Sequence, residues 1–274
     1  MINRGIALFS FQIVLALTHA TAAFERVPAG AREQAMCGAS LASRRDPFGL
    51  EANPADIPHP GGLMGGFSMT PGLFGMKELQ RTEAALSLDL FGGSGGILVR
   101  TFGFKLYRET TAMAALSVPL TQQVVLGAGL TWYSLTISGY GHAGTLGVSV
   151  GTTILLADQL RYALSLRNVN RPLLGRSREP IPTELLTGIE FEPLPSFLLA
   201  ASLTRDPDSP LCGSFGVEWI VEGRVVIRCG AQEGLRQFGA GAGVILGAVS
   251  LDYGISIHPD LGLTHQFSLS LCCP

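Results

Sequence analysis

The most constraining feature of this sequence is a long stretch, from Thr110 to Ala157, that contains no Asp, Glu, Lys or Arg. Two transmembrane helices would explain the lack of charge. However, Pro119, Gln122 and Gln123 interrupt the stretch, and its Gly, Ser and Thr residues tend to recur at every second position. A period of two is that of a β-strand, whose side chains point alternately to opposite faces. The stretch therefore predicts strands with one apolar face and one small or polar face.

The alternation is clearest between residues 124 and 133. One face carries Val124, Leu126, Ala128, Leu130 and Trp132, and the other carries Val125, Gly127, Gly129, Thr131 and Tyr133. Most of the similar runs along the chain approach the about 9 to 11 residues that a tilted strand needs to cross a bilayer. They predict about fourteen strands, near residues 63–73, 82–91, 96–104, 111–119, 124–136, 143–156, 160–168, 183–192, 197–205, 211–221, 224–232, 236–244, 248–257 and 262–271.

Connection lengths indicate how these strands are joined. Short connections, such as 157–159 and 222–223, alternate with longer ones, notably 169–182 and 206–210. An even number of strands with short turns at one end predicts an all-β fold, a closed antiparallel transmembrane β-barrel with both termini on the periplasmic side. A soluble β-sandwich is the alternative, but its second face would carry many charges. Here that face is mainly Gly, Ser, Thr and Ala, which favours the barrel.

The chain begins with the features of a secretory signal peptide. Asn3 and Arg4 precede an apolar run from Ile6 to Leu17, and residues 20–22 form a small-residue cleavage site. We therefore predict a signal peptide over 1–22, an N-terminal periplasmic or hatch-like segment over 23–61 and the outer-membrane barrel over 62–274. The expected location is the outer membrane of a Gram-negative-type (diderm) bacterium, in contact with outer-membrane lipid and lipopolysaccharide.

Composition agrees with a chain that meets lipid. The mean hydropathy is +0.35 although 35 of the 274 residues are Gly. Charged residues make up only 15% of the chain, below the roughly 25% of soluble domains. The formal net charge of -2 and the pI of about 6.2 give no overall positive field, so no nucleic-acid partner is expected.

Several charged residues fall on the face predicted to line the lumen. A two-residue turn at 222–223 would place Arg228 opposite Val217 on the lipid-facing side, at a cost of up to about 2 to 4 kcal/mol. A three-residue turn instead places Arg228 opposite Glu218, facing inward. Because mixed internal charges more often fix a barrel than catalyse a reaction, we assign a structural role to Arg161, Arg167, Glu184, Glu190, Glu218, Arg224, Arg228 and Asp252.

No pattern of catalytic or cofactor-binding residues emerges. The sequence contains no G-x-S-x-G, H-E-x-x-H or Walker A motif. His258 and His265 could meet at one hairpin end and bind a metal, but loop and interfacial roles are favoured. The five cysteines follow no zinc or disulfide spacing and are interpreted mainly as small apolar fillers. We therefore expect a non-enzymatic protein without cofactor or metal.

The residues also resemble a known family. Segments similar to those of PorV/PorQ-type outer-membrane barrels, which share the fold of the FadL fatty-acid transporters, occur at 158–160, 167–172, 179–185, 251–253 and 258–265. Residues 48–55 resemble a degenerate form of the Asn-Pro-Ala hatch segment of that superfamily. The resemblance covers about residues 46 to 271. It implies a fourteen-stranded outer-membrane barrel with an N-terminal segment inside or beneath it, and a role in type IX secretion or in passing hydrophobic molecules. The chain departs from the pattern in ending on 271–274 without a terminal aromatic.

Two non-enzymatic functions follow from these observations. In the first, the barrel receives or scaffolds exported protein cargo or secretion components, and its longest outer loop contacts an anionic partner or glycolipid through Arg171, Arg176 and Arg178. In the second, a small hydrophobic molecule passes through the lumen. The predicted lumen face is small, polar and mixed in charge, whereas an apolar ligand needs a mostly apolar pocket. The sequence therefore favours the secretion role, with FadL-like transport as the alternative.

Overall fold

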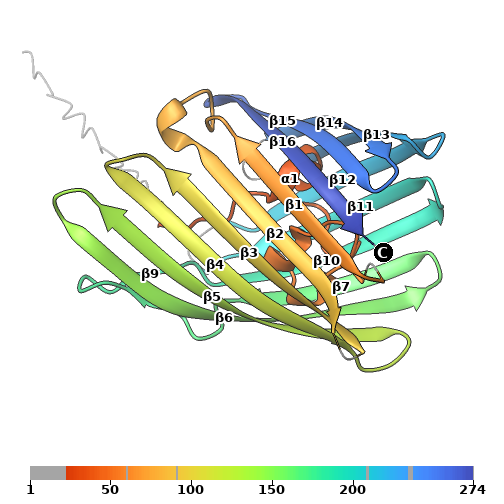
Figure 1. Ribbon diagram of the computed structural model, residues 1–274, viewed down its shortest axis with the longest axis horizontal. Helices are drawn as coiled ribbons and strands as arrows, with labels where there is room; N and C mark the ends of the chain where they lie inside the picture. Colours follow the sequence, from red (N-terminus) through yellow and green to blue (C-terminus); the bar gives the residue numbers. More distant parts are fainter. Residues whose placement is uncertain (1–22, 60, 91, 208–209, 234–236, 274) are drawn as a thin grey trace, which may run out of the picture.

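The computed structural model is a closed antiparallel β-barrel of fourteen strands, with the N-terminal segment inside it (Figure 1). It describes residues 23–59, 61–90, 92–207, 210–233 and 237–273. The predicted signal peptide, residues 1–22, lies outside the described residues. The order around the barrel follows the chain, and pairing of the first and last strands from Leu63↔Cys273 to Met69↔Phe267 closes the wall.

Each barrel strand pairs with its neighbours along the chain. The strands are β1 (Leu63–Thr70), β2 (Arg81–Leu90), β3 (Gly93–Gly103), β4 (Tyr107–Pro119), β5 (Val124–Ile137), β6 (Gly141–Ala157), β7 (Leu160–Arg167), β10 (Glu184–Leu194), β11 (Phe197–Arg205), β12 (Cys212–Val221), β13 (Val225–Gln232), β14 (Gln237–Leu246), β15 (Val249–His258) and β16 (Gly262–Cys273). The predicted fold class and strand number are thus confirmed.

The two faces of the wall follow the alternation in the sequence. In β5, Leu126, Leu130 and Trp132 are about half exposed, whereas Thr131 and Tyr133 are buried. In a barrel that crosses a membrane, exposed apolar side chains contact lipid, so this face needs no protein partner. The small and polar residues between them face inward and leave room for the N-terminal segment.

The structure differs from the predicted strands mainly at the outer ends. β4 begins at Tyr107 rather than at 111, and β1 ends at Thr70 rather than at 73. The long connection after β7 contains a small hairpin, β8 (Leu173–Leu174) and β9 (Glu179–Pro180). Pro172, Pro180 and Pro182 mark this segment as a loop in the sequence, and two-residue strands are too short to produce a visible alternation.

Helical structure is short. The N-terminal segment contains α1 (Gly30–Ala35), η1 (Gly49–Glu51) and η2 (Pro54–Asp56), and η3 (Lys77–Leu79) lies in the loop between β1 and β2. No helix in the described part of the chain is long and apolar enough to cross a membrane. Residues 23–59, named the plug below, are drawn in red and orange within the barrel (Figure 1).

Candidate functional site

The contact between the plug and the inner wall is the candidate functional site. Glycines in the wall let α1 approach β14 and β15 at backbone distance. A Cβ atom on Gly254 would lie 2.4 Å from the Ala31 carbonyl oxygen, and one on Gly239 would lie 2.4 Å from the Ala35 carbonyl oxygen. In the sequence, Gly239 is followed by Gly241 and Gly243 at every second position, a spacing that predicts only a strand. Its small size is needed because the helix backbone occupies the space of a side chain.

The Asn53-Pro54-Ala55 segment of the plug packs against β5 and β6 in the same way. A Cβ atom on Gly127 would lie 2.2 Å from the Ala55 nitrogen, and one on Gly151 would lie 2.0 Å from Asn53 Oδ1. The Asn53 amide donates hydrogen bonds to the Leu41 carbonyl at 3.0 Å and to Thr153 Oγ1 at 3.1 Å, and its oxygen accepts one from the Ala55 N–H. Asn53 is fully buried. This side chain therefore joins two turns of the plug to β6.

Ion pairs attach α1 to the wall. Arg32 Nε lies 2.8 Å from Glu218 Oε2 of β12, and Arg228 of β13 donates to the same oxygen at 2.7 Å. Arg228 also bonds Asp252 of β15. The Glu218↔Arg228 pairing confirms the inward position of Arg228 that the three-residue turn predicts. The Glu218 carboxylate of the wall thus accepts from Arg32 of the plug and from Arg228 of the wall, which supplies the partners that buried charges need.

A second ion-pair cluster surrounds η1. Arg100 of β3 donates to both oxygens of Glu51, at 2.6 Å for Oε1, and to Glu83 of β2 at 2.7 Å. Glu83 in turn accepts a hydrogen bond from the Gly30 N–H at 3.0 Å. Arg167 lies 3.5 Å from Glu51 and pairs with Glu184. The two clusters are on different sides of the plug, so the plug is fixed at both.

The pKa values of two plug carboxylates, Glu51 and Asp46, shift in opposite directions. Burial would raise the pKa of Glu51, but the guanidinium groups of Arg100 and Arg167 outweigh it and lower the pKa to about 2. Burial raises the pKa of Asp46 to about 6, because the attraction of Arg32 only partly offsets the loss of water. Glu51 therefore remains an anion at neutral pH, whereas Asp46 titrates close to the neutral range.

Seven of the eight predicted lumen charges face inward. Arg167, Glu184, Glu190, Glu218 and Arg228 are buried, and Arg161 and Asp252 are partly buried against Glu192 and Arg228. The prediction is wrong for Arg224, which lies exposed in the turn 222–224, because β13 begins only at Val225. Glu190 accepts hydrogen bonds from Ser40 Oγ and from the Leu41 and Ala42 N–H groups. Sequence reasoning missed the plug partners Arg32 and Glu51, although the plug segment is richer in charge than the chain as a whole, which is a usable signal.

Apolar patches fill the space between the ion-pair clusters. Phe48, Leu50 and Ile57 of the plug form one buried group with wall residues Ala85, Leu98, Met113 and Ala115. Three plug residues form a second group with two of the wall (Leu41, Ala42 and Ala52 with Ala163 and Leu186), and two more form a third (Met36 and Ala39 with Leu198 and Ala200). The expected small, polar lumen face is therefore wrong in part: the wall has apolar inward patches that the plug covers.

Another buried apolar group joins the start of the plug to the wall and to the β7–β10 connection. Phe24 stacks edge-on against Tyr133 with ring centroids 5.0 Å apart, and Leu174 and Ile181 of the β7–β10 connection complete the group. The Phe24 N–H donates to Glu109 of β4 at 3.1 Å. The loop therefore contributes its apolar side chains to the lumen. Its arginines Arg171, Arg176 and Arg178 remain exposed.

Cys37, His258 and His265, the residues considered as a filler and as metal ligands, each have separate partners. Burial raises the pKa of the Cys37 thiol to about 12, in keeping with a role as a filler. His265 hydrogen-bonds the Tyr253 hydroxyl at 2.7 Å, and His258 accepts from the backbone N–H groups of Asp260 and Leu261. Among the described residues, no group of three or more His, Cys, Asp or Glu has the arrangement of a metal site.

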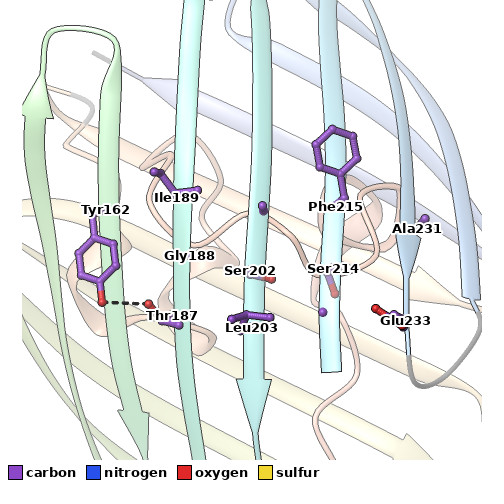
Figure 2. A pocket seen from close by; sticks show the side chains of 12 residues that line it. Tyr162, Thr187, Gly188, Ile189, Ser202, Leu203, Ser214, Phe215, Ala231 and Glu233 are labelled. Carbon is purple, nitrogen blue, oxygen red and sulfur yellow. Dashed lines mark hydrogen bonds between the residues drawn. The ribbon is translucent and has the colours of Figure 1, made fainter. Parts of the chain in front are cut away.

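The outer wall carries an open groove of about 540 Å³ between β7 and β13 (Figure 2). Ile189, Leu203 and Phe215, which border it, belong to the exposed lipid-facing rows. At one side the Thr187 hydroxyl donates a 3.0 Å hydrogen bond to the Tyr162 hydroxyl, drawn as a dashed line in Figure 2. The groove therefore opens on the exposed outer face of the wall.

Comparison with solved structures identifies the fold. The chain is similar to the CymD monoaromatic hydrocarbon channel, with a TM-score of 0.66, 14% identity and coverage of 88% of this chain and 96% of that one. It is similar to the Pseudomonas putida toluene transporter TodX (TM-score 0.67, 12% identity, 91% and 98% covered) and to a Pseudomonas aeruginosa FadL homologue (0.64, 10%, 88% and 97%). At these identities the likeness establishes the fold alone.

Sequence comparisons add no narrower assignment. No family model matches the chain, and no curated protein matches it. The FadL-like part of the resemblance drawn from the sequence is thus supported at the level of fold. The PorV/PorQ part, with its secretion partners and exported cargo, finds no support in these comparisons.

Proposed function

We propose that this protein passes small hydrophobic molecules across the outer membrane, without catalysing a reaction. The proposal reverses the order favoured by the sequence, in which a secretion role came first. It is supported by the fold shared with the hydrocarbon channels CymD and TodX. The chain's own structure supplies a further reason, which concerns what the plug covers.

The main structural support for this proposal is that much of the contact between the plug and the wall is apolar. Apolar inward patches on β2 to β4, on β7 and β10, and on β11 are each covered by apolar residues of the plug. When the plug shifts, these patches can bind an apolar molecule that would otherwise have to cross a polar layer. The ion pairs at Glu218 and Glu51 resist such a shift, so the described arrangement is the closed state.

A reversible cross-link between plug and wall tests this proposal. The Cβ of Leu41 lies 3.4 Å from the position of a Cβ on Gly188, close to the roughly 3.5 to 4.5 Å of a disulfide. Leu41→Cys and Gly188→Cys would be combined in a chain whose five native cysteines are replaced by alanine. Uptake of toluene and of a medium-chain fatty acid into proteoliposomes would then be measured before and after reduction.

We expect uptake by the reduced protein and uptake near the protein-free rate after oxidation. The two single-cysteine variants, treated in the same way, control for oxidation damage. Equal uptake by the oxidised and reduced double variants would show that passage does not require plug movement. Failure of the unmodified barrel to accelerate uptake of either molecule would overturn the transport proposal itself.

A further inference from the structure

The outer rim of the wall at β4 to β6 carries a row of basic side chains that the transport proposal does not use. The register places Arg108 of β4 opposite Thr136 of β5, and Thr136 opposite His142 of β6. Adjacent strands are about 4.8 Å apart, so Arg108 and His142 lie roughly 10 Å apart on one row. Both are exposed and belong to the outward-facing, lipid-side positions of their strands.

Two loops extend this row. The hairpin β8–β9 lies beside β6, since a Cβ atom on Gly175 would be 3.3 Å from that of Ala143. Asn170 fixes the start of the same loop by bonding the Val148 N–H and the Leu146 carbonyl of β6. Ala143 faces inward between His142 and Gly144, so the exposed Arg176 and Arg178 of the hairpin tip lie at the rim beside the row rather than on its outward face. On the other side, the loop of Lys105 is tied to β5 and β6 by the bond from the Ser138 N–H to the Leu106 carbonyl.

We name this surface, made of Lys105, Arg108, His142, Arg176 and Arg178, the cationic ledge. Its Lys and Arg side chains are exposed, and none has a described carboxylate within 4.0 Å. Two acids lie nearby. Glu109 is buried, where it accepts hydrogen bonds from the Phe24 N–H and the Tyr107 hydroxyl. Glu179 in the hairpin is exposed, but a single carboxylate does not neutralise the exposed Lys and Arg side chains. The ledge therefore has an excess of positive charge that is available to an anionic partner.

The wall below the ledge shows which partner fits. Trp132 lies four residues from Thr136 along β5, roughly 13 Å towards the periplasmic end, on the same outward face. It is half exposed, and its indole ring occupies the space above Gly144. Tryptophan marks the boundary between the hydrocarbon core and the head groups. The ledge thus lies at the level of the outer head groups, and its Arg108 and His142 face sideways into them.

We propose that the cationic ledge binds the phosphate groups of a glycolipid in the outer leaflet, with its acyl chains against the apolar wall below. Guanidinium groups suit this chemistry because they donate paired hydrogen bonds to phosphate oxygens. A protein partner would approach from above the rim, whereas Arg108 and His142 point out from the wall. The proposal does not depend on the transport function.

Binding to diphosphoryl lipid A in detergent micelles tests the proposal on the full mature barrel. The ledge variant combines Arg108→Gln, Arg176→Gln and Arg178→Gln. A matched control removes the same number of exposed positive charges from other parts of the barrel, through Lys77→Gln, Arg205→Gln and Arg224→Gln. Heat-modifiable migration on gels confirms that each variant is folded. Enzymatically dephosphorylated lipid A and millimolar inorganic phosphate are compared as ligand and competitor.

We expect the unmodified barrel to bind the phosphorylated lipid at least about tenfold more tightly than the dephosphorylated one. The ledge variant should lose this preference, and the control variant should keep it. Equal binding of the two lipids, or an equal loss in both variants, would overturn the proposal. Complete displacement of the lipid by inorganic phosphate would also overturn it, because the site would then recognise free phosphate rather than a lipid.

Discussion

Arg32 in α1 and Glu218 in β12 are 186 positions apart in the sequence, yet their side chains form a buried 2.8 Å ion pair inside the barrel. Glu218 also accepts a 2.7 Å hydrogen bond from Arg228 at the same carboxylate oxygen. The neutral amide in Glu218→Gln would leave two guanidinium groups buried without their common anion. We expect a loss of roughly 3 to 5 kcal/mol in the free energy of unfolding.

Urea unfolding in detergent micelles measures this loss. The control is Arg224→Gln in the exposed turn that precedes β13, which should change the free energy of unfolding by less than about 0.5 kcal/mol. Equal effects of the two substitutions would show that the ion pair between plug and wall does not stabilise the barrel.

Asp46 makes barrel stability depend on pH. Burial raises its pKa in the folded protein to about 6, from 3.8 for the free side chain. Folding therefore favours the protonated form. This contribution is fully present below about pH 4 and is lost as the pH rises through about 6. Asp46→Asn keeps an oxygen that can accept the 3.0 Å bond from the Phe48 N–H. It should remove this part of the pH dependence.

Urea midpoints measured below pH 4 and near pH 7 test the effect. Between these values, the unmodified barrel should lose more stability than Asp46→Asn does. Asp158→Asn, an exposed turn residue between β6 and β7, should behave like the unmodified barrel. Identical pH profiles for Asp46→Asn and the unmodified barrel would contradict the assignment.

Asn53 tests how firmly the plug is held to β6. Its amide bonds the Leu41 carbonyl and Thr153 Oγ1 in a fully buried position. Asn53→Ala leaves these acceptors unpaired, at roughly 1 to 3 kcal/mol for each buried group that finds no new partner. We expect faster trypsin cleavage at the plug arginines, of which Arg32 is buried in the structure. Asn170→Ala, which removes two exposed bonds to β6, is the matched control. Unchanged cleavage in Asn53→Ala would mean that Asn53 does not retain the plug.

The wall could be predicted from the sequence because its determinants are local. Apolar and small residues alternate within each strand, and the turn at 222–224 fixes the pairing of Glu218 with Arg228. The contents of the lumen could not be predicted in the same way. Met113 and Leu98 occupy inward positions that their strands' pattern leaves mostly small, and their partners Phe48 and Ile57 come from a segment without periodicity. Contacts between such distant segments depend on the closed barrel as a whole.

The glycines of β5 and β6 show the same limit and lead to the last prediction. In the sequence, Gly127 has the place of an empty lumen position, but in the structure the plug backbone occupies that place. A Cβ there would lie 2.2 Å from the Ala55 nitrogen, and backbone cannot move aside as a flexible side chain can. Gly127→Val should therefore displace the Asn53-Pro54-Ala55 segment and leave the wall intact.

The control is Gly213→Ala on the lipid-facing side of β12, where the added Cβ meets Leu203 at an ordinary 3.6 Å. We expect Gly127→Val to keep heat-modifiable migration, because the wall still folds. Trypsin should cleave its plug several times faster. Uptake of an apolar molecule should no longer depend on the cross-link between positions 41 and 188. A plug that stays as protected as that of Gly213→Ala would show that the segment does not rest against Gly127.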